Sequence, residues 1–103
     1  MKTLFENSGG TLKVALMGEL DESTASEVRS ALDEHILNSP GHRVIIDLSA
    51  LSFMDSTGIG VLVGRYRKFR NDVAFFIADP NATVDKILRL SGIYMIMPRI
   101  ETA

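Results

Sequence analysis

The chain has 103 residues, 46% of them hydrophobic, which suits one domain with its own core, and we expect residues 1–103 to form that single domain. The absence of cysteine excludes disulfides, thiolate nucleophiles and zinc–thiolate sites, and it agrees with a reducing, cytoplasmic location. The 11 basic and 13 acidic side chains leave a net charge of -2, which does not favour nucleic acid, and no apolar run is long enough for a signal peptide or a membrane span.

The first predicted elements are two short strands that form a hairpin. Residues 3–5 and 11–18 flank the turn-forming residues 7–10, which include the two glycines that a tight hairpin turn favours. In the second strand, apolar side chains alternate with the others, as expected for a strand buried mainly on one face: Leu12, Val14 and Leu16. Gly18 is the predicted end of this strand.

A helix is predicted between residues 19 and 41. Its apolar residues recur at spacings of three and four and form one stripe: Ala25, Val28, Ala31, Leu32 and Ile36. Thr24 and Glu27 have the spacing of a capping box at the helix start, and Pro40 with its neighbours ends the helix.

The second half of the chain alternates strands and helices. Residues 44–48 form a short β-branched run, expected to be a central parallel strand buried on both faces, and residues 72–79 form a second apolar strand. Pro80 lies near the start of a helix that Gly92 ends, and one more short strand is expected after it. This order predicts an α/β fold with a mixed, mostly parallel central sheet of about five strands and helices packed on it.

The segment Asp-Ser-Thr-Gly, residues 55–58, stands where a strand-like stretch turns into another helix. Serine and aspartate both favour N-caps, so spacing alone favours a plain helix cap at Ser56 over chemistry. Ligands of open α/β sheets also bind at such places, beyond the carboxyl ends of the strands. The pattern therefore leaves a structural and a functional interpretation of Ser56 open.

The helix that begins here is predicted to have three different faces. An apolar face is expected to pack against the sheet: Ile59, Leu62, Val63, Tyr66 and Phe69. Ser56, Gly60 and Gly64 follow at four-residue steps and form a neighbouring stripe without bulk, which lets another surface come close. The basic residues near the helix end suit the helix dipole, and we expect them to be a solvated face: Arg65, Arg67, Lys68 and Arg70.

Sequence patterns of enzymes are missing around Ser56. No glycine stands two residues before it, as a nucleophile elbow requires, and His35 and His42 both lie upstream, where we expect them at the surface. There is no phosphate-binding loop, and the acidic residues 19–22 have no matching histidine or calcium-loop pattern. We therefore expect no catalytic residue, no metal and no cofactor.

Three segments resemble a known family. Residues 51–69, "LSFMDSTGIGVLVGRYRKF", closely resemble the signature of the anti-sigma factor antagonists, bacterial single-domain members of the STAS fold. Residues 18–25, "GELDESTA", resemble the family's loop into the first helix, and residues 88–93, "LRLSGI", resemble a third segment. Together they span nearly the whole chain, and the resemblance implies a STAS-like fold.

The resemblance also implies a partner switch. In this family the unmodified protein binds an anti-sigma factor that is also a serine kinase, and this binding releases a sigma factor for transcription. The kinase then phosphorylates the serine directly after the aspartate of the motif, which corresponds to Ser56 here and makes Thr57 the less favoured acceptor. A metal-dependent serine phosphatase reverses the modification.

The implied partner surface combines the loop into the first helix with the segment around the serine: Asp21, Glu22, Ser23, Asp55, Ser56, Thr57, Gly58 and Gly60. We expect a monomer, because no helix has a second apolar stripe free for self-association. The alternative is a binding module of the same fold without a phospho-switch, in a stress-signalling complex or a lipid-transport system. A small nucleotide-binding or hydrolytic enzyme is a third class, and it lacks a catalytic base.

Overall fold

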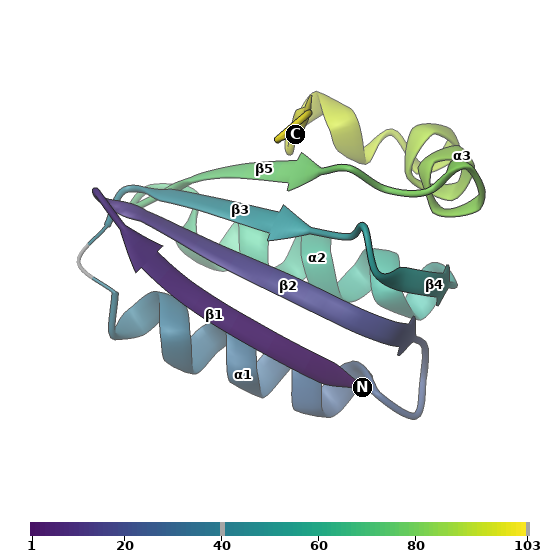
Figure 1. Cartoon of the computed structure of the whole chain (residues 1–103), viewed down its shortest axis with the longest axis horizontal. Coiled ribbons are helices and arrows are strands. Elements are labelled where there is room, and N and C mark those ends of the chain that lie inside the picture. The colour runs from purple at the N-terminus through teal and green to yellow at the C-terminus, as the bar shows by residue number, and fades with distance from the viewer. Residues whose placement is uncertain (40, 103) are drawn as a thin grey trace.

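The computed structural model describes residues 1–39 and 41–102. Its elements in chain order are β1 (Lys2–Ser8), β2 (Thr11–Leu20), α1 (Ala25–Leu37), β3 (Arg43–Asp47), β4 (Leu51–Met54), α2 (Ser56–Phe69), β5 (Ala74–Ala78), α3 (Ala82–Ser91), a 3₁₀ helix (Ile93–Met95) and β6 (Arg99–Ile100). Figure 1 shows α1 and α2 on one face of the sheet, with α3 and the C-terminal segment beyond the β5 edge. The predicted α/β fold is confirmed, with one strand, β4, more than expected.

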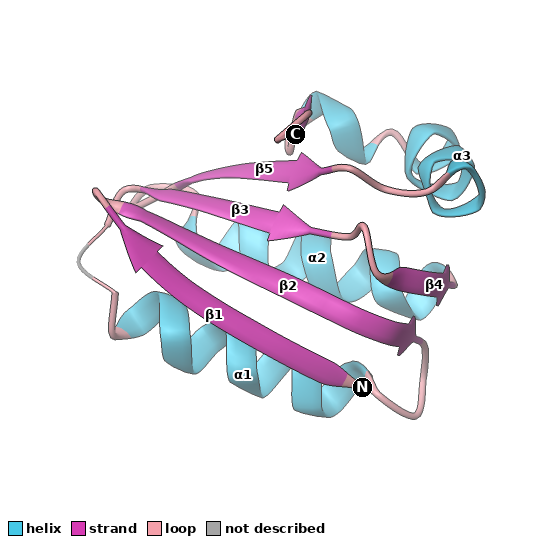
Figure 2. Cartoon of the chain, viewed as in Figure 1, coloured by secondary structure: helices cyan, strands magenta, loops and turns pink. Residues whose placement is uncertain are grey.

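The sheet is mostly parallel, as predicted. Its order is β1-β2-β3-β5-β6, and β4 lies outside this order because it pairs with β2 beyond the end of β3. Among the strand pairs of the described residues, the pairing of β1 with β2 is antiparallel and the others are parallel. Figure 2 shows the resulting two layers, with strands in front and the two long helices behind them.

The predicted hairpin is confirmed, but its turn is shorter than the predicted residues 7–10, because Asn7 and Ser8 still pair with β2. Gly9 and Gly10 alone separate the paired residues Ser8 and Thr11, and their φ angles of +55° and +83° are those that glycine adopts most easily. The predicted end of β2 at Gly18 is wrong. Gly18 already pairs with Leu51 of β4, and after a register shift that forms a bulge the strand continues to pair with β4 through Leu20.

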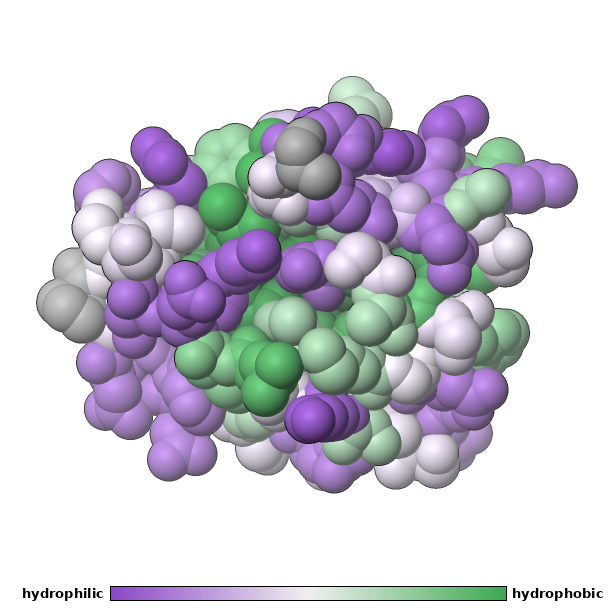
Figure 3. All heavy atoms as spheres, viewed as in Figure 1, coloured by the Kyte–Doolittle hydropathy of each residue, from purple (hydrophilic) through white to green (hydrophobic). Residues whose placement is uncertain are grey.

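The core lies between the sheet and the two long helices. Alternate residues of β2 and β3 point into it, so that Val14, Val44 and Ile46 are almost fully buried. The prediction that β3 is buried on both faces is wrong, because Ile45 is only half-buried on the face without helices. Figure 3 shows this open face, where apolar side chains gather between charged ones.

Helix α1 begins without the predicted capping box. The Thr24 side chain makes no cap hydrogen bond, because its hydroxyl donates to the carbonyl of Glu19 (2.8 Å) and accepts from the N–H of Asp21 (3.0 Å). Thr24 thus closes the loop before the helix instead of its first turn. The predicted stop at Pro40 lies outside the described residues, and the helix ends at Leu37.

The predicted apolar stripe of α1 is confirmed, although Ala31 is only half-buried. The other four residues of the stripe are buried: Ala25, Val28, Leu32 and Ile36. The two histidines differ in their surroundings. His42 is exposed, as predicted, whereas the His35 ring is half-buried and stacks on Phe5 of β1 with the ring centroids 3.4 Å apart. The stack fixes the helix beneath the edge strand.

Helix α2 buries a charge that was expected in solvent. Leu62 and Phe69 are buried as predicted, but Arg65 is also buried, with 8% of its surface exposed. Its Nε lies 2.9 Å from an Asp33 carboxylate oxygen of α1, and Lys68 lies 3.2 Å from the other oxygen. The close Arg65 contact lacks the alignment of a hydrogen bond, so attraction between charges links the two helices.

The other predicted residues of the apolar face are half-buried and pack against the core: Ile59, Val63 and Tyr66. The N-terminal turn of α2 comes closest to the sheet at Gly58, which is buried. A Cβ atom at this position would lie 3.0 Å from the side chains of Leu20 and Met54 and from the carbonyl oxygen of Leu20. Glycine therefore fits best where α2 crosses the ends of β2 and β4, since any larger residue would force these neighbours to shift.

Helix α3 is capped at both ends. The Asn81 side chain accepts a hydrogen bond from the N–H of Val84 (2.8 Å) and donates to the carbonyl of Leu51 in β4 (2.9 Å). Gly92 ends the helix with a φ of +80°, as predicted. The last predicted strand is confirmed as the two residues of β6.

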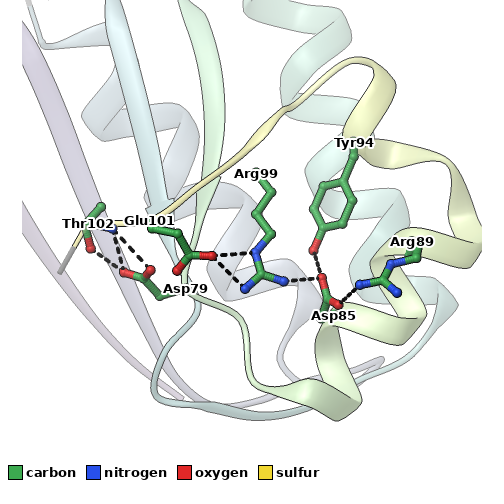
Figure 4. Close-up of polar contacts among 7 residues, drawn as sticks. All are labelled: Asp79, Asp85, Arg89, Tyr94, Arg99, Glu101 and Thr102. Atoms are coloured by element: carbon green, nitrogen blue, oxygen red, sulfur yellow. Dashed lines mark hydrogen bonds and ion pairs between the residues drawn. The ribbon is translucent and has the colours of Figure 1, made fainter.

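A carboxylate at the first turn of α3 holds the C-terminal segment in place (Figure 4). One oxygen of the buried Asp85 accepts hydrogen bonds from the Tyr94 hydroxyl (2.6 Å) and from Arg99 of β6 (2.7 Å), and the other pairs with Arg89. The Tyr94 hydrogen bond, more than the two arginines, keeps the pKa of Asp85 below its ordinary value. This cluster joins α3, the 3₁₀ helix and β6.

Asp85→Asn should lower the free energy of unfolding at pH 7 by about 1–3 kcal/mol, because the amide cannot replace a carboxylate that accepts charge-assisted hydrogen bonds. The folded-state pKa is lowered, so this stabilisation is complete above the unfolded pKa and is lost as the pH falls through the folded one. Urea unfolding followed by circular dichroism should show the gap between wild type and variant closing between about pH 5 and pH 2. A gap that stays constant, or an equal loss in the exposed control Asp72→Asn, would contradict the assignment.

Gly58→Ala should destabilise the protein by about 1–3 kcal/mol, because its methyl group enters occupied space. Gly60→Ala is the matched control on the same helix, since a Cβ there meets nothing within 4 Å. The control should be neutral or stabilise by up to about 1 kcal/mol through helix propensity. Thermal unfolding measures both, and a Gly58→Ala variant as stable as the control would refute the packing account.

Candidate functional site

Two loops meet at the carboxyl ends of β2 and β4. Leu20 and Met54 are partners in the parallel ladder, and the N–H of Asp55 donates to the carbonyl of Leu20 (3.4 Å). The chain then enters the loop before α1 on one side and the first turn of α2 on the other. The structure therefore brings together the two segments that the sequence singled out, which are more than 30 residues apart along the chain.

Asp55, and not Ser56, is the N-cap of α2. One Asp55 carboxylate oxygen accepts hydrogen bonds from the N–H groups of Thr57 (2.9 Å) and Gly58 (3.3 Å). Ser56 is the first residue of the helix and is exposed. Within residues 1–39 and 41–102, no hydrogen bond occupies its hydroxyl. The cap that spacing suggested for the serine is supplied by its neighbour, which leaves the hydroxyl free.

The residues that follow differ in what they offer to a partner. Thr57 is half-buried and Gly58 is buried, so Gly58 lies under the surface and offers no contact of its own to a partner. Gly60 is exposed, and neither Gly60 nor Gly64 has an atom within 4 Å of the place where a Cβ would lie. The predicted stripe without bulk is confirmed as an open strip along α2 that begins at Ser56.

The neighbouring loop is built around a second aspartate. One oxygen of Asp21 accepts hydrogen bonds from the N–H (2.9 Å) and hydroxyl (2.7 Å) of Ser23 and from the N–H of Thr24 (3.3 Å). The Ser23 hydroxyl is the main reason that the pKa of Asp21 lies below its ordinary value. Glu22 and Ser23 are exposed, so an ordered, acidic loop lies beside the start of α2.

One exposed residue near the site was not predicted. Phe53 of β4 keeps 41% of its surface exposed, whereas Leu51 and Met54 of the same strand are buried. The sequence analysis did not predict a strand at residues 51–54, and without that strand it had no basis for placing the Phe53 side chain at the surface. An exposed aromatic ring on the strand that leads into Ser56 adds apolar contact area to this end of the molecule.

The described residues include no group of three or more His, Cys, Asp and Glu side chains arranged to hold a metal ion. In the same part of the chain, no helix combines the length and the apolar character needed to cross a membrane. At the site itself, the exposed Ser56 hydroxyl lies at a helix N-terminus with acidic side chains next to it.

Comparison with known proteins agrees with this geometry. The family model of the STAS domain matches residues 3–103. An anti-sigma F factor antagonist of Paenibacillus polymyxa is 38% identical over 94 residues, which cover 90% of this chain and 80% of the relative.

Two solved structures of SpoIIAA have the same fold. The unphosphorylated form of this anti-sigma factor antagonist matches with a TM-score of 0.83 and 26% identity, covering 99% of this chain and 89% of that one. The phosphorylated form of the Bacillus protein matches with a TM-score of 0.74 and 25% identity, covering 99% and 92%. From the fold, the site and these relatives together, the chain belongs to the anti-sigma factor antagonists of the STAS domain family.

Proposed function

We propose that this chain is a phosphorylation-controlled anti-sigma factor antagonist whose switch is Ser56. The unphosphorylated protein binds an anti-sigma factor through the acidic loop and the open strip of α2, and phosphorylation of Ser56 prevents that binding. The observation that carries the proposal is the exposed Ser56 hydroxyl, which is free of hydrogen bonds in the described residues and lies at the N-terminus of a helix capped by Asp55.

The position of the serine suits a modification that leaves the fold intact. A phosphate adds about -1.5 to -2 charges and three acceptor oxygens. At the first turn of α2 the helix dipole and the free N–H groups favour negative charge, so the folded state tolerates it. The added charge lies beside Asp55 and the acidic loop, and it therefore changes the surface that a partner meets.

The switch acts by repulsion and bulk at an interface. A partner that packs closely over Gly60 and the exposed serine has no room for a phosphate, and an acidic partner is repelled by it. Each 1.4 kcal/mol of lost binding free energy weakens the affinity tenfold. A loss of a few kcal/mol on phosphorylation is therefore enough to release the partner.

The proposed partners are those that the resemblance to the family implies. The anti-sigma factor is itself the serine kinase that modifies Ser56, and a metal-dependent serine phosphatase restores the hydroxyl. The chain works as a cytoplasmic monomer by binding and not by catalysis, and it requires no cofactor of its own.

Ser56→Asp should abolish capture of the anti-sigma factor kinase, because it places a negative charge at the switch. Immobilised wild type and variant are incubated with lysate of the source organism and ADP, and mass spectrometry identifies the retained proteins. Ser56→Asn is the matched control, since it has the size of aspartate without the charge, and it should retain much more of the kinase than Ser56→Asp.

Other results of this experiment have clear meanings. Equal retention of one partner by all three proteins would make Ser56 a structural residue and favour a binding module without a phospho-switch. Retention of membrane-transport components by the wild type would favour the lipid-transport alternative. Equal losses in Ser56→Asp and Ser56→Asn would indicate that size, and not charge, controls the interface.

Incubation with the kinase and ATP should phosphorylate the wild type and Thr57→Ala, but not Ser56→Ala, because the Thr57 side chain is half-buried. Intact-mass and peptide mass spectrometry measure the modification. Urea unfolding of the phosphorylated protein should give a free energy within about 0.5 kcal/mol of the unmodified one, as expected for a charge change at the surface. Phosphorylation of Ser56→Ala, or a much larger loss of stability, would refute the proposed site or the proposed mechanism.

A further inference from the structure

A cavity of about 420 Å³ lies at the end of α2 opposite to Ser56. It opens between the last turns of α2, the start of β5 and the segment that leads into β6. Apolar and aromatic side chains supply much of its wall: Tyr66, Val73, Phe76, Ile96 and Pro98. Both its volume and this lining are in the range of small-molecule binding sites.

A backbone group on one wall of this cavity lacks its ladder partner. Along β5, the Ala74 N–H donates to the carbonyl of His42, directly before β3 (2.9 Å), whereas the Ile77 N–H donates to the carbonyl of Pro98 on the other side (3.0 Å). Because these directions alternate, the carbonyl of Phe75 also points away from β3. A parallel β6 would pair that carbonyl with the N–H of residue 98, but proline has none.

The break in the ladder and the cavity have the same origin. Upstream of Pro98 the chain leaves β5 for the 3₁₀ helix instead of continuing as a strand, since β6 pairs only with Ile77 and Ala78. Phe75 and Pro98 both line the space that this departure leaves. The wall thus presents the carbonyl of Phe75 as a hydrogen-bond acceptor, beside the N–H of the same residue, among apolar side chains.

The rim of the cavity carries one charge of each sign. Arg70 and Asp72 both line it and are both exposed. In the ranges that the structure describes, neither side chain makes a hydrogen bond or an ion pair, although the two residues are close in sequence. Two free and opposite charges beside an apolar cavity complement a zwitterion with an apolar body.

We propose that this cavity binds a free apolar α-amino acid, such as one with an aromatic side chain. The carboxylate of the ligand accepts hydrogen bonds from Arg70, and its ammonium group donates to Asp72 and to the carbonyl of Phe75. The side chain of the ligand lies against Val73 and Ile96. The site is separate from Ser56 and does not depend on the function proposed for it.

The test is a titration of the ¹⁵N-labelled full chain with L-phenylalanine up to about 10 mM, followed by NMR. We expect saturable shifts of the amide signals of residues 73–76 and of Ile96. Three analogues lack one part each: 3-phenylpropionate the ammonium, phenethylamine the carboxylate and glycine the side chain. Each should bind at least about tenfold more weakly, as expected for the loss of a charge-assisted hydrogen bond or of the apolar contact.

Arg70→Gln should weaken L-phenylalanine binding by about tenfold through loss of the carboxylate contact. Arg67→Gln is the matched control, because Arg67 is an exposed arginine of the same helix that does not line the cavity, and it should leave the affinity unchanged. Equal effects of the two variants would overturn the proposal, as would the absence of shifts at residues 73–76. Binding of 3-phenylpropionate or phenethylamine as tight as that of the amino acid would also overturn it.

Discussion

The parallel pairing of β2 with β4 is the constraint on which the site depends. It forms because β2 does not stop at Gly18 but passes a bulge and continues beyond the end of β3. The pairing aligns Leu20 with Met54, so the loop before α1 and the first turn of α2 leave the sheet side by side. Without these last residues of β2, the acidic loop and the serine would lie on separate parts of the surface.

Two aspartates hold the two segments of the site in shape, and neither of them is the proposed phosphorylation site. Asp21 closes one loop and Asp55 caps the helix, each by folding a carboxylate back onto nearby N–H groups. These hydrogen bonds satisfy backbone groups that a serine hydroxyl would otherwise have served. Ser56 can therefore stay exposed at a rigid helix end, which is the condition that a kinase substrate and a partner surface share.

Features with a local cause were predictable from the sequence. The glycines of the hairpin and Gly92 act within a few residues of themselves, and they lie where the patterns placed them. The strand β4 escaped prediction because its four residues gain their pairing from β2, far away in the chain. The burial of Arg65 depends on Asp33 of another helix, and Thr24 had two loop partners that no spacing rule could reveal. Ser56 was identified by resemblance, while its freedom from capping needed the structure.

The packing of Gly58 shows that the four residues 55–58 serve two different purposes, since some maintain the fold and another carries the proposed switch. The glycine is favoured because α2 passes so close to Leu20 and Met54 that a methyl group would push these neighbours aside, whatever happens at the serine. A protein with the same crossing would keep an aspartate and a glycine at these positions even after its serine had been replaced. In a newly sequenced genome, the aspartate and glycine would therefore identify the architecture, and only the residue directly after the aspartate would indicate whether a gene product offers a hydroxyl group to a kinase.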